Sequence, residues 1–238
     1  MTVSAFPWPG LARKRHPLIN ENIRYFKELD QSRPIEEYDF VVFDTELTGL
    51  DERRDEIVSI GAVRIRNLRI VAGDTFHVHV KPTQPLPKDS TLVHRITPQN
   101  LVNAPLLDEV LPRFVEYCDK ALLVGYYTAL DTAFLNRFAK RILGATMRNP
   151  CIDTLRLARV HLELCGLPRR HCHGEGISYS LAGLSELYNL PAFVPHDALQ
   201  DALQTAYLFL FLVKKLQAGG YRTLRQLFRA GHGARWTL

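Results

Sequence analysis

The sequence predicts an α/β fold built on a mixed β-sheet. Three runs rich in β-branched and aromatic residues, at 40–44, 57–65 and 70–80, are separated by short polar turns. Connections this short join antiparallel neighbours. A fourth apolar run, at 121–125, ends in a glycine and leads into a helical pattern, an arrangement typical of open α/β sheets.

Composition places the chain among ordinary globular proteins. Its 238 residues carry a net charge of +5 and are 46% hydrophobic, which suffices for one substantial core. A pI near 9.1 permits contact with a polyanion but is also common without one. The four cysteines form no Cys-x-x-Cys pair, so no zinc ribbon or thioredoxin-like motif is indicated. We find neither a signal-peptide pattern nor a run of roughly 18 apolar residues, and we expect a soluble, cytoplasmic protein without membrane contact.

The first residues differ in composition from the rest and predict an N-terminal extension with one short helix. Ile23, Phe26 and Leu29 mark that helix by their spacing. The chain thus divides into an extension, a main domain and a basic C-terminal tail, at 1–37, 38–216 and 217–238.

Further helices are predicted where apolar residues recur every three or four positions. These patterns follow the proline-rich stretch at 82–87. They lie at 97–100, 110–117, 134–142, 153–164, 179–188, 196–216 and 223–229. Asp153 and Asp197 are placed to cap two of these helices at their N-termini.

Two carboxylates separated by one residue end the first strand. Side chains alternate across a strand, so Asp44 and Glu46 project from the same face. Their repulsion would be relieved by a divalent cation, and carboxylate oxygens are the ligands that Mg²⁺ and Mn²⁺ prefer. Taken alone, the pair equally fits two solvated acids at a strand-to-turn junction.

Three later residues add to this pair. Asp131 follows the strand that ends at Gly125, where open α/β sheets keep their sites, although it also fits a helix N-cap. Asp201 lies in the first turns of a long helix, and His196 precedes it by five residues. The His-Cys-His run at 171–173 lacks the spacing of zinc ligands and favours a basic loop over a metal site.

Three segments, in order, resemble the three motifs of the DEDDh exonucleases, the DnaQ-like family. They are Asp44-Thr-Glu46-Leu-Thr-Gly-Leu50, Val124-Gly-Tyr-Tyr-Thr-Ala-Leu-Asp131 and His196-Asp-Ala-Leu-Gln-Asp201. The resemblance covers about residues 38–215, and three ordered motifs are far more specific than one. The chain is similar to the proofreading epsilon subunit of bacterial DNA polymerase III. This implies a ribonuclease-H-like α/β/α sandwich with a mixed sheet of about five strands.

The resemblance also implies a 3′-to-5′ exonuclease that releases nucleoside monophosphates and uses two Mg²⁺ or Mn²⁺ ions. Asp44 would bridge both ions, and Glu46 and Asp201 would bind the one that prepares the attacking water. Asp131 would belong to the same metal site, but its main effect would be indirect, through residues that surround the ions. His196 would be the general base, since the ordinary pKa of histidine is close to neutral pH.

Four residues are expected to contact the substrate. By resemblance, Thr45 would touch the terminal nucleotide through its backbone and Leu47 would pack on the base. Leu47 departs from the family, in which many members have threonine, and Tyr126-Tyr127 replaces a His-Asn pair. The two tyrosines fit stacking on a base or bonding to a phosphate, and equally fit packing at a strand end.

The leading hypothesis is hydrolysis of single-stranded or frayed DNA 3′ ends, in proofreading or repair. An RNA-trimming enzyme of the oligoribonuclease or ribonuclease T kind is an alternative, because recognition of a 2′-hydroxyl cannot be read from these residues. A noncatalytic subunit that binds a DNA polymerase is another, and the intact acids and His196 argue against it. Gln226-Leu-Phe228 weakly resembles a sliding-clamp-binding tail.

Overall fold

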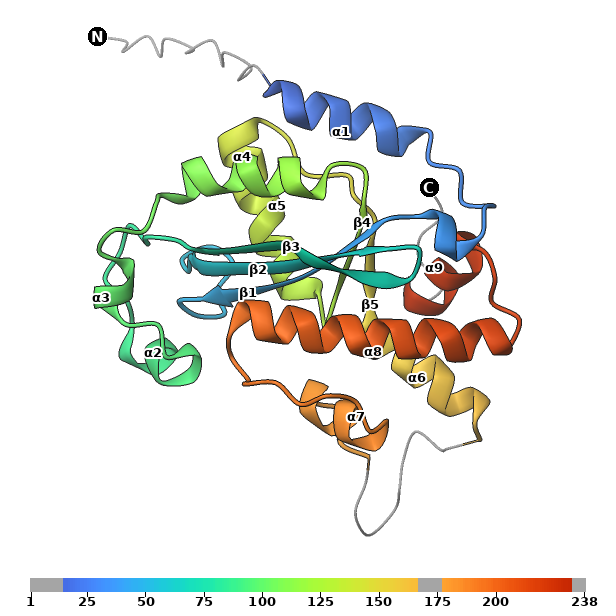
Figure 1. The fold of residues 1–238 in the computed structure, drawn as a ribbon. Coiled ribbons are helices and arrows are strands. Elements are labelled where there is room, and N and C mark those ends of the chain that lie inside the picture. Colours follow the sequence, from blue (N-terminus) through green and yellow to red (C-terminus); the bar gives the residue numbers. More distant parts are fainter. Residues whose placement is uncertain (1–14, 167–176, 233–238) are drawn as a thin grey trace, which may run out of the picture.

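The computed structural model describes residues 15–166 and 177–232, so the 171–173 run lies outside the described residues. A five-stranded sheet forms its centre, with helices on both faces (Figure 1). The strands are β1 Phe40–Leu47, β2 Ile57–Arg66, β3 Arg69–His79, β4 Leu122–Gly125 and β5 Cys151–Asp153, in the spatial order β3-β2-β1-β4-β5. The predicted α/β fold is therefore confirmed.

Strand β1 occupies the middle of the sheet and has neighbours of both kinds. It pairs antiparallel with β2, and β2 pairs antiparallel with β3. On its other side β1 pairs parallel with β4, and β4 pairs parallel with β5. β5 was not among the predicted strands, because three residues are too few to show an alternating pattern.

Ten helical segments surround the sheet in the described residues. They are α1 Pro17–Lys27, the 3₁₀ turn η1 Ile35–Glu37, α2 Lys88–His94, α3 Pro98–Leu101, α4 Leu107–Cys118, α5 Ala129–Leu143, α6 Thr154–Leu164, α7 Leu181–Leu187, α8 Ala198–Ala218 and α9 Leu224–His232. Figure 1 shows α4 on one side of the sheet and α8 on the other.

Alternation along β1 divides the core into two layers. Phe40 and Val42 pack in the cluster that includes the buried face of α8, whereas Val41 and Phe43 pack in the cluster that includes α4 and α5. The same alternation continues past Phe43. The side chain at 44 therefore projects toward the α8 side of the sheet.

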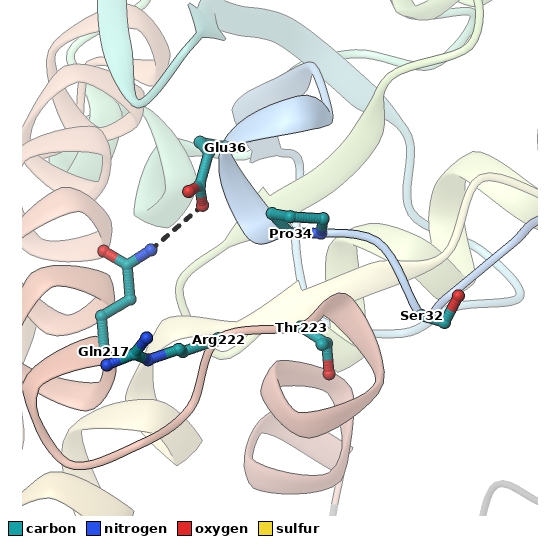
Figure 2. A pocket seen from close by; sticks show the side chains of 6 residues that line it. All are labelled: Ser32, Pro34, Glu36, Gln217, Arg222 and Thr223. Carbon is teal, nitrogen blue, oxygen red and sulfur yellow. Dashed lines mark hydrogen bonds between the residues drawn. The ribbon is translucent and has the colours of Figure 1, made fainter.

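The N-terminal and C-terminal segments pack against each other. Backbone hydrogen bonds join Ile35 to Arg222 and Leu224 to Arg33, and a pocket of about 450 Å³ lies at this junction. Figure 2 shows the side chains that line the pocket, among which Gln217 donates to Glu36 at 3.2 Å.

The C-terminal segment contains a packed helix. Leu224 and Leu227 of α9 are fully buried in the core, and the Gln226 side chain accepts hydrogen bonds from the N–H groups of Arg222 and Thr223. Leu227 is thus buried, whereas Gln226 is exposed and hydrogen-bonded to its own chain, and binding of this segment to a sliding clamp stays a prediction. The three domain boundaries stay a prediction. Within the described ranges, no helix is long and apolar enough to cross a membrane.

Candidate active site

Three carboxylates converge at the carboxyl end of β1. Asp44 and Glu46 come from β1 itself, and Asp201 comes from the first turn of α8. One ligand oxygen of each lies within 4.8 Å of the others. Residues separated by more than 150 positions in the sequence therefore form one acidic group, as the ordered motifs predicted.

The close approach of α8 to the sheet depends on a glycine. Gly61 of β2 is the partner of Asp44 in the antiparallel register. A Cβ atom at Gly61 would overlap the backbone of Ala198 and Leu199. The missing side chain allows the first turn of α8 to lie directly on the sheet, and this brings Asp201 to the carboxylates of β1.

The start of α8 is capped and holds the preceding loop. Asp197 is the N-cap, as predicted, and its Oδ1 accepts from the Gln200 N–H at 3.0 Å. The N–H of His196 donates to Oδ2 of Asp201 at 2.9 Å. His196 has a φ of 62° and is exposed. The loop backbone is therefore fixed to a site carboxylate while the imidazole stays accessible.

Asp131 reaches the site from the other neighbour of β1. It lies in the first turn of α5, directly after β4, and its Oδ1 accepts hydrogen bonds from both the N–H and the hydroxyl of Thr45. The N–H bond is 3.2 Å long. The Thr45 amide therefore has an acceptor inside the protein, and the expected contact of the Thr45 backbone with a nucleotide stays a prediction. Asp131 is thus coupled to the strand residue between Asp44 and Glu46.

Burial raises the pKa of every acid in this group, and the charges of neighbouring acids add to the shift. Burial, followed by the charges of Asp131, Glu46 and Asp201, raises the pKa of Asp44 well above its usual value. Burial, followed by the charges of Asp201 and Asp131, raises the pKa of Glu46 to about 8. Burial raises the pKa of Asp131 to about 6 against the opposing hydrogen bonds from Thr45, and it also raises the pKa of Asp201.

This donor set fits a divalent cation. Carboxylate oxygens are hard ligands, and three of them lie close enough together to share one ion. Charged oxygens at this spacing repel one another when no cation is bound. The residues present therefore suit Mg²⁺ or Mn²⁺, and a solvated acidic pair no longer describes Asp44 and Glu46.

The predicted substrate residues have different surroundings. The Tyr126 hydroxyl donates to the backbone oxygen of Tyr179 and its ring packs on the core, so it has the packing role. Tyr127 is 65% exposed with a φ of 52°, and its N–H donates to Asp153 at 3.1 Å. Leu47 is partly buried against the α4–α5 side of the core.

Some residues that shape the site were not singled out from the sequence. Arg137 of α5 donates to the backbone oxygens of Glu52 and Asp55, in the loop that follows β1. An arginine within an amphipathic helix usually faces solvent, so its position alone gives no signal. A glycine inside a strand pattern, as at Gly61, is a recognised sign of close backbone approach.

Comparison with known proteins identifies related sequences. The family model RNase_T, described as an exonuclease, matches residues 41–209. DNA polymerase III subunit epsilon of Aquifex aeolicus is 32% identical over 192 residues, which are 79% of this chain and 89% of that protein. A PolC-type DNA polymerase III of Caldanaerobacter subterraneus is 37% identical over 80% of this chain, but the match spans only 13% of that protein.

Solved structures share the fold. Exonuclease I of E. coli in complex with a dT13 oligonucleotide aligns with a TM-score of 0.66 at 18% identity, over 77% of this chain and 42% of that one. Exonuclease X in complex with 5′ overhanging duplex DNA aligns with a TM-score of 0.58 at 25% identity, over 81% and 99% of the two chains.

Proposed function

Because this chain belongs to the RNase_T exonuclease family, we propose that it removes mononucleotides from the 3′ ends of single-stranded or frayed DNA by metal-dependent hydrolysis. The observation that carries the proposal is the convergence of Asp44, Glu46 and Asp201, with one oxygen of each within 4.8 Å of the others. Relatives named as DNA polymerase III proteins support DNA as the substrate.

The acids form a site for two divalent cations. Asp44, Glu46 and Asp201 would bind the ions directly, and Asp131 would hold the Thr45 segment between the two strand ligands. When bound, Mg²⁺ or Mn²⁺ supplies positive charge that favours attack by water on the phosphodiester and stabilises the departing 3′ oxygen.

His196 acts as the general base. Its exposed imidazole lies beside Asp201, to which its own backbone is hydrogen-bonded, so it can reach a water near the acids without unwinding α8. A neutral imidazole nitrogen has a lone pair that can accept a proton from a water molecule. His196 takes the proton as the water oxygen attacks the phosphorus.

Leu47 and Tyr127 hold the terminal nucleotides. Tyr127 presents an exposed ring at the end of β4, and aromatic stacking retains a single strand whatever its sequence. Leu47 directly follows the metal-site acids of β1 and offers an apolar contact to the last base. Single-stranded DNA 3′ ends are thus the proposed partner. A role beside a DNA polymerase in the cytoplasm is part of the proposal, and the name of the Aquifex relative supports the polymerase.

The direct test is digestion of matched DNA and RNA oligonucleotides labelled at the 5′ end. We expect a ladder of products shortened from the 3′ end of DNA with Mg²⁺ or Mn²⁺, and no products with EDTA. Asp44→Asn should lower the rate about a thousandfold, since metal charge stabilisation contributes several kcal/mol. His196→Ala should lower kcat by about 10²–10⁴-fold.

Each alternative has its own result in this assay. Faster loss of RNA than of DNA would replace the substrate assignment with an RNA-trimming enzyme. If neither oligonucleotide is shortened, the noncatalytic interpretation takes its place. Melting curves of Asp44→Asn with and without Mn²⁺ provide the control that the variant is folded.

A further inference from the structure

The loop between β1 and β2, residues 48–56, is built around one carboxylate. Asp55 accepts from the Thr48 hydroxyl at 3.0 Å and from the Asp51 N–H at 2.8 Å. Across the base of the loop the Thr48 N–H donates to the Glu56 backbone oxygen, and the Glu56 N–H donates to the Thr48 hydroxyl, both at 2.9 Å. Gly49 leaves room for this arrangement, since a Cβ there would lie 2.5 Å from Asp55 Oδ2. The β1–β2 loop therefore has a defined internal structure.

A single side chain fastens this loop to α5. The two terminal nitrogens of the Arg137 guanidinium donate to the backbone oxygens of Glu52 and Asp55. The guanidinium carbon lies 4.1 Å from the centre of the Phe138 ring and 5.0 Å from that of Phe134. A planar guanidinium can span two carbonyls while it stacks on rings, which the point charge of a lysine cannot do.

The Arg137 contacts connect the β1–β2 loop to a helix that also carries an acid of the site. Helix α5 carries Asp131 in its first turn, six residues before Arg137. The β1–β2 loop begins directly after Leu47, and its Leu50 is 78% exposed. Arg137 thus joins the helix that carries Asp131 to the loop that carries the exposed Leu50.

We infer, on the basis of the proposed exonuclease activity, that Arg137 is a positioning residue for substrate selection. It holds the β1–β2 loop against α5, so that Leu47 and Leu50 form a preformed apolar surface for the base of the terminal nucleotide. A preformed surface binds more tightly than one that must be ordered during binding. Arg137 acts through the loop and does not touch the reacting atoms.

The test compares two DNA oligonucleotides that differ only at the 3′ terminus, one with a normal nucleotide and one with an abasic nucleotide. For Arg137→Lys we expect KM to rise about tenfold for the normal end, the scale of a lost apolar contact. We expect kcat to change less than about twofold and the abasic end to be unaffected, because only base binding has been lost.

The matched control is Arg141→Lys. Arg141 lies one turn further along α5, over the same Phe138 ring at 4.8 Å, and its guanidinium pairs with Asp108 at 3.1 Å. Leu50→Ala, at an exposed position, should reproduce the selective rise in KM without altering the fold. Arg141→Lys should leave both oligonucleotides at wild-type values.

Hydrogen exchange provides a readout that needs no activity. In Arg137→Lys without substrate, the amides of Thr48 and Asp51 should exchange at least tenfold faster, while those in β1 stay protected. Equal losses on both oligonucleotides, a fall in kcat alone, or unchanged exchange in the loop would overturn the inference. If wild type cleaves neither oligonucleotide, the proposed function fails, and exchange still decides whether Arg137 holds the loop.

Discussion

At the scale of single residues, burial of the charged acids at the end of β1 is electrostatically unfavourable. Glu46 is 8% exposed, and its pKa is raised to about 8 by burial and by the nearby acids Asp201 and Asp131. A carboxylate with a raised pKa favours the folded state while it is protonated and opposes folding once it is charged. The site is therefore electrostatically unfavourable in the absence of a cation.

The raised pKa of Glu46 predicts how the stability of the folded protein depends on pH. The contribution of Glu46 is fully present below its ordinary pKa of 4.5 and is lost as pH rises through about 8. The melting temperature of the metal-free protein should fall over this range, and Mn²⁺ should raise it more at pH 8 than at pH 6. Differential scanning fluorimetry with EDTA or Mn²⁺ measures both effects.

Glu46→Gln serves as the control for this pH dependence. It removes one titrating group, so the metal-free melting temperature should fall less steeply with pH than in wild type. A slope identical to wild type would show that Glu46 does not carry the effect.

At the scale of elements, the site depends on how α8 meets the sheet. The packing of Ala198 and Leu199 against Gly61 sets the distance of Asp201 from Asp44. The helix cannot shift at this end without moving a proposed metal ligand. The fit between one glycine and one helical turn is therefore part of the catalytic geometry.

Gly61→Ala should consequently weaken both stability and cation binding. Forcing a methyl group into this contact should cost about 1–3 kcal/mol of folding free energy, and displacement of Asp201 should lower Mn²⁺ affinity by calorimetry. Gly219→Ala, at the opposite end of α8, is the control, because its nearest contact would be 3.3 Å, against 2.1 Å at Gly61. Equal Mn²⁺ affinity in both variants would contradict the role assigned to Gly61.

The elements also show what could be read from sequence. The caps Asp153 and Asp197 were predicted correctly, because a side chain two or three residues from its partner leaves a local signal. Strand β5 was not predicted, because three residues are too few to show a pattern. The hydrogen bond between Thr45 and Asp131 was not predicted either, because it joins residues 86 positions apart.

At the scale of the whole molecule, the ribonuclease-H-like α/β/α arrangement expected from the three motifs is confirmed by the sheet order and by the exonuclease neighbours. The clustering of Asp44, Glu46 and Asp201 was predicted because the three ordered motifs indicate which residues lie together in the fold. Arg137 was not found, because its contacts with Glu52 and Asp55 depend on the path of a loop.

The C-terminal helix α9 is packed into the core of the protein. Leu227 is fully buried, and α9 packs on α6 and β5. Leu227→Ala should destabilise the protein by about 2–5 kcal/mol, which lowers Tm by roughly 2–4 °C per kcal/mol in a chain of this size. Exposed Arg229→Ala on the same helix is the control. Equal melting temperatures would mean that α9 is a dispensable tail.

The acids of the site come from distant parts of the chain, and their order along the chain determines when the site forms during synthesis. Asp44 and Glu46 leave the ribosome early, Asp131 follows with α5, and the third clustered carboxylate arrives only with α8. A nascent chain that has not yet released α8 holds two of the three clustered carboxylates and lacks Asp201. The order of residues along the chain thus delays any nuclease activity until the sheet already has its parallel strands in place.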